Sequence, residues 1–153
     1  MDVAVSIGVQ RMVRSGLARS GVVFSVDTET GFPDVIVISA AWGLGETVVQ
    51  GSVDPDIYRV FKPFLERADT APLIERSLGA KERKMIYATG GSVRTLTKRT
   101  TRRERETFVL SDDEVLELAR CAKPIEQHHG RAMDMEWTTD CSTRELFIHQ
   151  ARP

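Results

Sequence analysis

Residues 133–153, MDMEWTTDCSTRELFIHQARP, predict two short strands that face each other across a polar turn. Apolar and polar residues alternate in both halves, and a period of two puts every second residue of a strand on the same face. Asp134 and Glu136 therefore share one face of the first strand, and Gln150 and Arg152 share one face of the second. If the register joins these faces, two carboxylates, an amide oxygen and a guanidinium converge.

Such a group of side chains has the chemistry of a magnesium-nucleotide site. Mg²⁺ coordinates carboxylate and carbonyl oxygens, and a planar guanidinium matches phosphate oxygens. The pattern therefore predicts a nucleotide site at the end of the chain.

The composition predicts one soluble, cytoplasmic domain. The chain has 153 residues, of which 41% are hydrophobic and 28% charged, and a length of this order supports a single core. No apolar run approaches the roughly 20 residues of a transmembrane helix, and the N-terminus lacks the pattern of a signal peptide. A net charge of -1 gives no general attraction to nucleic acid or membranes. Cys121 and Cys141 are expected to be reduced thiols.

Most of the chain before residue 90 reads as an antiparallel meander. Short β-branched stretches are separated by turns that contain glycine or proline. We expect strands at residues 3–13, 22–26, 34–40, 57–63 and 84–88. No element is assigned to residues 64–83. Gly90 and Gly91 are expected to form a flexible interruption between elements. The basic residues between 98 and 105 are expected to form the charged tip of a hairpin. A solvated loop is favoured there over a nucleic-acid patch, because the run has no interleaved aromatic residues.

The sequence WGLGETVVQG, residues 42–51, interrupts this pattern. Two glycines followed by Glu46 and a small apolar run fit a turn that leads into a short helix. A glycine turn before a helix can hold phosphate, but the spacing alone favours a tight turn at a sheet edge.

One long helix is expected over about residues 112–128. Ser111 and Glu114 have the spacing of a capping box, and Gly130 stands where a left-handed stop is expected. Between them an apolar stripe recurs at steps of three and four residues, namely Val115, Leu118, Ala119, Ala122 and Ile125. One helix beside a mainly antiparallel sheet gives an α+β fold as a single domain over residues 1–153.

Several segments, in order, resemble the ATP-binding region of the phosphoenolpyruvate synthase (pyruvate, water dikinase) family. They are residues 9–63, which contain VQRMV and WGLGETVVQGSVDPD, followed by LGAK at 78–81, SDDEVLELA at 111–119, IEQHHG at 125–130, MDMEWTTD at 133–140 and LFIHQARP at 146–153. Pyruvate phosphate dikinase and rifampin phosphotransferase share this architecture. The resemblance implies an ATP-grasp fold, with this chain as the carboxyl-terminal part of the nucleotide-binding module.

For the phosphate end of the site, the resemblance implies that Glu136 and Gln150 bind Mg²⁺ and the phosphates. Arg152 would be the catalytic cation on the phosphate oxygens, and Asp134 would support the cluster. These are the residues that strand alternation also brings together.

For the base end, the resemblance implies that a segment lines the adenine, namely Gln10, Arg11, Met12 and Val13. Backbone groups would contact the base edge, and Met12 would pack on the ring. Glu46 would be a further nucleotide contact.

The implied reaction converts pyruvate, ATP and water to phosphoenolpyruvate, AMP and phosphate. The chain lacks the family's amino-terminal jaw, phosphohistidine domain and pyruvate-binding barrel, so we expect it to be inactive alone and to need those domains in cis or trans. The family's glycine-rich segment is absent, so His128, His129 and His149 are not expected to carry phosphate. The exposed cleft could also support a homo-oligomer. The alternatives are a non-catalytic remnant or interaction module with the ATP-grasp fold, and a fragment of a rifampin phosphotransferase-like enzyme.

Overall fold

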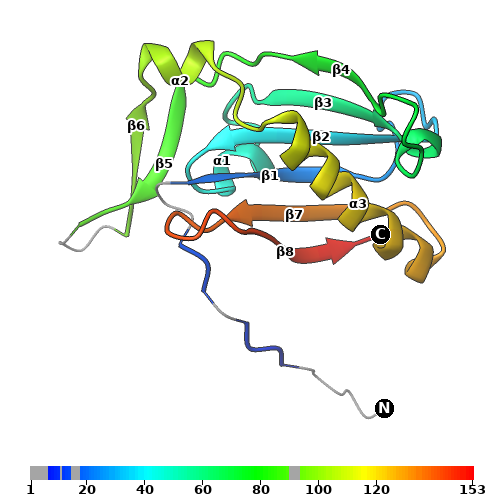
Figure 1. Cartoon of the computed structure of the whole chain (residues 1–153). Coiled ribbons are helices and arrows are strands. Elements are labelled where there is room, and N and C mark those ends of the chain that lie inside the picture. Colours follow the sequence, from blue (N-terminus) through cyan, green and yellow to red (C-terminus); the bar gives the residue numbers. More distant parts are fainter. Residues whose placement is uncertain (1–6, 11, 15–17, 90–93) are drawn as a thin grey trace.

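A computed structural model describes residues 7–10, 12–14, 18–89 and 94–153. A six-stranded antiparallel sheet with the strand order β4-β3-β2-β1-β7-β8 forms the centre of the molecule (Figure 1). Its strands are β1 (Arg19–Phe24), β2 (Val35–Trp42), β3 (Asp56–Phe61), β4 (Leu73–Ser77), β7 (Asp134–Thr139) and β8 (Leu146–Arg152). The first four form an antiparallel meander, in which β1, β2 and β3 correspond to expected strands and β4 does not. The last two return beside β1.

The remaining elements lie around this sheet. A separate hairpin stands at one end of the sheet (Figure 1) and consists of β5 (Arg83–Tyr87) and β6 (Thr95–Arg99). The helical segments are α1 (Glu46–Val49), the 3-10 turn η1 (Lys62–Phe64), α2 (Arg102–Glu106) and α3 (Asp112–His129). The α+β class and the single long helix are therefore confirmed.

The main core lies between α3 and one face of the sheet. The stripe expected on α3 is buried at Val115, Leu118, Ala119 and Ala122. The strand register places Val23 of β1 beside Ile38 of β2 and Met135 of β7, and all three side chains are fully buried in the same cluster. Since alternate residues of a strand face opposite ways, the neighbouring residues of β1 and β7 face away from α3.

Both predicted ends of α3 are confirmed. The Ser111 hydroxyl accepts a hydrogen bond from the backbone N–H of Glu114, and the Glu114 carboxylate accepts one from the N–H of Ser111. Gly130 ends the helix with a φ of 64°, in the left-handed region that glycine adopts without strain. Arg19 of β1 also donates two hydrogen bonds to Glu114, at 2.8 and 2.6 Å, and so ties the start of α3 to the sheet.

Two sequence-based expectations are wrong, and one region that was left without an element contains a strand. Residues 7–10, 12 and 13 of the strand expected at 3–13 are not in a strand, and residues 3–6 and 11 lie outside the described residues. The region left without an element contains β4. The basic run is not a hairpin tip: Lys98 and Arg99 lie in β6, and the following residues form α2, which has its own capping box at Thr101 and Glu104. Gly90 and Gly91 also lie outside the described residues.

Strands β7 and β8 pair with a bulge. Asp134 lies opposite Arg152 and Glu136 opposite Gln150, but Trp137 lies opposite Ile148. One step along β7 therefore corresponds to two steps along β8, and His149 is the extra residue. The bulge moves the alternation by one position, so Phe147 rather than Ile148 shares the face of Gln150.

Among the described residues, no helix is long and apolar enough to span a membrane.

Candidate functional site

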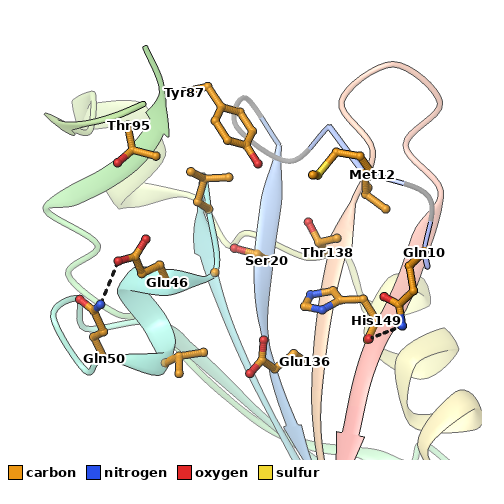
Figure 2. A pocket seen from close by; sticks show the side chains of 14 residues that line it. Gln10, Met12, Ser20, Glu46, Gln50, Tyr87, Thr95, Glu136, Thr138 and His149 are labelled. Carbon is orange, nitrogen blue, oxygen red and sulfur yellow. Dashed lines mark hydrogen bonds between the residues drawn. The ribbon is translucent and has the colours of Figure 1, made fainter. Parts of the chain in front are cut away.

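A pocket of about 590 Å³ lies on the sheet face opposite α3 (Figure 2). Side chains from distant parts of the chain line it: the segment before β1, the turn into α1 and α1 itself, the β5–β6 hairpin, and strands β1, β7 and β8. The lining residues include Gln10, Met12, Val13, Ser20, Glu46, Gln50, Tyr87, Thr95, Glu136, Thr138 and His149. Predicted base-end and phosphate-end residues therefore meet at one cavity.

Glu136 and Thr138 reach the pocket because they alternate with the buried Met135 and Trp137 on β7. Trp137 can pack so closely because its neighbour on β1 is Gly21. A Cβ on Gly21 would lie 1.9 Å from the carbonyl oxygen of Ser39 and 2.9 Å from Nε1 of Trp137. The indole Nε1 donates to that same oxygen at 3.2 Å. This packing fixes the strand that carries Glu136.

The turn into α1 places Glu46 on another wall of the pocket. Gly43 has a φ of +84°, and a Cβ there would lie 2.3 Å from the carbonyl oxygen of Met85. The close approach lets the N–H of Leu44 donate to that oxygen at 2.9 Å, which joins the turn to β5. Gln50 donates to the Glu46 carboxylate at 2.9 Å. The expected turn into a short helix is confirmed, whereas phosphate binding by this turn stays a prediction.

The segment that carries Gln10, Met12 and Val13 is attached to the β7–β8 hairpin. Gln10 Nε2 donates to the carbonyl oxygen of His149 at 3.2 Å (Figure 2). The N–H of Arg14 donates to Oδ2 of Asp140 at 3.4 Å, and the N–H of Cys141 donates to the Arg14 carbonyl oxygen at 3.0 Å. Met12 is 79% exposed beside the cavity. The predicted contact Arg11 lies outside the described residues.

The predicted convergence on β7 and β8 is confirmed as geometry. Gln150 Nε2 lies 3.3 Å from Oε1 of Glu136, and Arg152 Nε donates to Oδ2 of Asp134 at 2.8 Å. The hydrogen bond to Asp134 raises the pKa of Arg152 above its ordinary value. Of these four residues only Glu136 lines the pocket; the other three lie on or beside the same strand face. Their roles with a ligand remain predictions.

The same corner offers oxygen ligands that fit Mg²⁺. Within the described residues, no group of three or more His, Cys, Asp and Glu side chains could hold a metal ion. Mg²⁺ does not require such a cage, because it usually keeps several waters and binds one or two carboxylates plus substrate phosphates. Oδ1 of Asp134 is buried without a hydrogen-bond partner among the described residues. This unpaired oxygen, beside the Glu136 carboxylate and the Gln150 amide, is consistent with a nearby cation.

Sequence reasoning missed several residues that line the pocket. Thr138 follows Asp134 and Glu136 at the same two-residue step, so alternation alone could have identified it. Tyr87 and Thr95 carry no local signal, because only the tertiary position of the β5–β6 hairpin brings them to the pocket. His149 depends on the bulge, which strict alternation cannot predict.

Comparison with known proteins assigns the chain to a family. The sequence model of the family described as "Pyruvate phosphate dikinase, AMP/ATP-binding domain" matches residues 1–153. The chain belongs to this family. The resemblance identified from the motifs is therefore confirmed, and the pocket lies in a domain of the pyruvate phosphate dikinase AMP/ATP-binding type.

Curated relatives cover almost the whole chain. It is 52% identical to the phosphoenolpyruvate synthase of Synechocystis sp. and 50% identical to that of Escherichia coli, in each case over 99% of this chain and 19% of the relative. It is 37% identical to the probable phosphoenolpyruvate synthase of Methanocaldococcus jannaschii, over 99% of this chain and 12% of the relative. The chain thus spans a fifth or less of the length of these relatives.

Proposed function

We propose that the pocket binds Mg-ATP as part of the nucleotide-binding module of a phosphoenolpyruvate synthase with an ATP-grasp fold. The observation that carries this proposal is the meeting of Met12 and Val13, Glu46 and Glu136 around one cavity. Its volume of about 590 Å³ lies within the range of small-molecule and cofactor sites.

The two ends of the pocket suit the two ends of a nucleotide. Met12 offers an unbranched, polarizable side chain to the face of the base, and Val13 adds an apolar wall. At the other end, the oxygens of Glu136 and Gln150 would hold Mg²⁺, with Asp134 supporting them. Bound there, the metal would neutralise phosphate charge and orient the triphosphate.

Arg152 is proposed as the cation for the phosphate oxygens. Its ion pair with Asp134 uses Nε and fixes the direction of the guanidinium. Neither Nη nitrogen donates a hydrogen bond within the described part of the chain, and two parallel N–H groups suit phosphate. Glu46 at the start of α1 would repel a bare phosphate, so it is better placed as a contact to the metal or its waters.

Phosphoryl transfer depends mainly on positioning and on electrostatic stabilisation. In the proposed enzyme, the rest of the protein supplies the opposite jaw, the histidine that receives the phosphoryl group and the site for pyruvate. This chain's share is to bind and orient the nucleotide. A synthase module is favoured over a remnant because five of the predicted contacts line one cavity, namely Gln10, Met12, Val13, Glu46 and Glu136.

Calorimetric titration of Mg-ATP into the chain tests the proposal. We expect saturable binding that Glu136→Gln weakens about tenfold or more, since a hydrogen-bonded charged group contributes roughly 1.5–3 kcal/mol. Glu117→Gln is the matched control, because Glu117 is exposed on α3. Equal affinities for wild type and Glu136→Gln, or no binding by the folded chain, would contradict the proposal.

A further inference from the structure

His149 owes its place in the pocket to the bulge in β8. Without the bulge, it would alternate with Gln150 and face the opposite side of the strand from Glu136. The register instead places His149 as an unpaired residue between the Glu136–Gln150 pair and the Trp137–Ile148 pair. Bulges commonly re-aim a side chain beside a functional site. The imidazole accordingly lines the cavity together with Glu136 and Thr138.

The His149 backbone is anchored, whereas its ring is available. Gln10 Nε2 donates to the His149 carbonyl oxygen at 3.2 Å. Figure 2 shows the ring inside the pocket, between the side chains of Thr138 and Glu136. Neither ring nitrogen has a hydrogen-bond partner among the described residues. A neutral imidazole offers one donor and one acceptor.

Nearby polar side chains already have partners. The Thr138 hydroxyl donates to the carbonyl oxygen of Arg19 at 3.2 Å. The Ser20 hydroxyl donates to the carbonyl oxygen of Gly43 at 2.6 Å. Among the described residues of β1, β7 and β8 that line the pocket, the His149 ring thus keeps both of its nitrogens free beside Glu136.

We propose that His149 hydrogen-bonds a sugar hydroxyl of the bound nucleotide. This inference rests on the proposed function, which places the base at Met12 and Val13 and the metal and phosphates at Glu136. In any nucleotide the sugar joins the base to the phosphates. His149 lies between those two ends, because its ring is beside Glu136 and its carbonyl oxygen is bonded to Gln10 of the base-end segment. An imidazole is a poorer ligand for Mg²⁺ than the neighbouring oxygens, which favours the sugar over the metal as its partner.

The test compares ATP with 2′-deoxy-ATP and 3′-deoxy-ATP, each with Mg²⁺, by calorimetry on the chain. Wild type should bind one of the two deoxy analogues about three- to tenfold more weakly than ATP, the usual effect of one neutral hydrogen bond. His149→Val should weaken ATP binding by the same factor and leave the Kd of that analogue unchanged. His149→Asn, which keeps a donor and an acceptor, should retain part of the discrimination.

His129→Val is the matched control, since His129 lies at the end of α3 and outside the pocket; it should behave as wild type. A merely structural role for His149 would weaken all three ligands equally, and that result would overturn the inference. The inference would also be overturned if His149→Val still bound ATP more tightly than that deoxy analogue, or if wild type bound ATP and both analogues equally well. Binding that is sensitive to Glu136→Gln but indifferent to His149 would refute this inference alone. A folded chain that binds none of the three ligands would refute the proposed function as well.

Discussion

Asp56 and Lys81 form an ion pair whose side chains are both fully buried. Lys81 Nζ donates to Oδ1 of Asp56 and, at 3.0 Å, to the carbonyl oxygen of Gly79. Oδ1 also accepts the N–H of Gly79 at 2.9 Å, and Oδ2 accepts the N–H of Val109 at 2.7 Å. The pair therefore joins the start of β3 to the turn before β5 and to the loop before α3.

Lys81→Met should destabilise the chain by about 3–5 kcal/mol, because it leaves a buried carboxylate without its cation. Lys123→Met is the control: its pair with Glu66 is at the surface, with Glu66 71% exposed, and such pairs contribute about 0–1 kcal/mol. Urea unfolding measures both variants. A similar small loss for the two would show that the buried pair is not a structural requirement.

For single residues, the sequence predicted one part of the candidate site and missed another. Period-two alternation correctly brought Asp134, Glu136, Gln150 and Arg152 together, because a short antiparallel hairpin leaves few registers. It could not predict which of them reach the cavity, since that depends on how far the pocket extends along the strands. It also could not place His149, because no residue type marks the bulge.

Among the elements, the β7–β8 turn holds the segment that bears Met12 and Val13. Asp140 accepts hydrogen bonds from the hydroxyl and N–H of Ser142 and from the N–H of Arg14. These bonds, that of the Ser142 hydroxyl foremost, lower the pKa of Asp140 well below its ordinary value. The ionised carboxylate is thus the form that the turn favours.

Asp140→Asn should therefore reduce stability at neutral pH. A carboxylate whose pKa is lowered by folding contributes fully above its unfolded pKa of about 3.9, and the contribution is lost as the pH falls through the lower, folded value. The gap in unfolding free energy between wild type and Asp140→Asn should be constant from pH 7 to about pH 5 and close below about pH 4. Urea unfolding across this range measures the gap. A gap that widens on acidification would contradict the assignment.

Close packing of β1 against β2 and β7 depends on Gly21. Gly21→Ala should destabilise the chain by about 1–3 kcal/mol or more, as overpacking does, because the added Cβ would meet the backbone oxygen of Ser39 at 1.9 Å. Gly8→Ala is the control, since nothing lies within 4 Å of a Cβ there. Thermal unfolding distinguishes the two. A Gly21→Ala variant as stable as wild type would mean that the strands are less tightly packed than described.

Elements with a strong local pattern were predicted, and those that depend on tertiary contacts were not. The cap, stripe and stop of α3 are all local. Strand β4 is an edge strand with mostly exposed side chains, so it shows no alternation. Helix α2 is short and charged; it is held by Lys84, which pairs with Glu104, and by Trp42 Nε1, which donates to the Glu104 carbonyl oxygen at 2.9 Å. Neither contact can be read from the segment itself.

At the scale of the whole molecule, the chain is a fraction of the synthases that it resembles. It spans 19% of the Synechocystis and Escherichia coli relatives. The pocket is open beside Met12, which is 79% exposed, and interactions with phosphate weaken where water and salt have access. We therefore propose that other parts of the protein close this pocket.

The chain alone should not form AMP from ATP in a pyruvate-dependent manner, because the proposed phosphoryl acceptor and pyruvate site belong to the rest of the enzyme. A coupled assay for AMP, with and without pyruvate, measures this. A preparation of a complete phosphoenolpyruvate synthase is the positive control. Pyruvate-dependent AMP from the purified chain would contradict this division of roles.

NMR chemical-shift mapping with Mg-ATP tests the location of the nucleotide most directly. We predict saturable shifts of the backbone amides of Val13, Glu46, Glu136 and Thr138, around the pocket opposite α3. A second hollow lies between Arg19, Trp42 and Arg144 and should be unaffected. Shifts confined to that hollow, or none at saturating Mg-ATP, would contradict the claim that this face of the sheet binds the nucleotide.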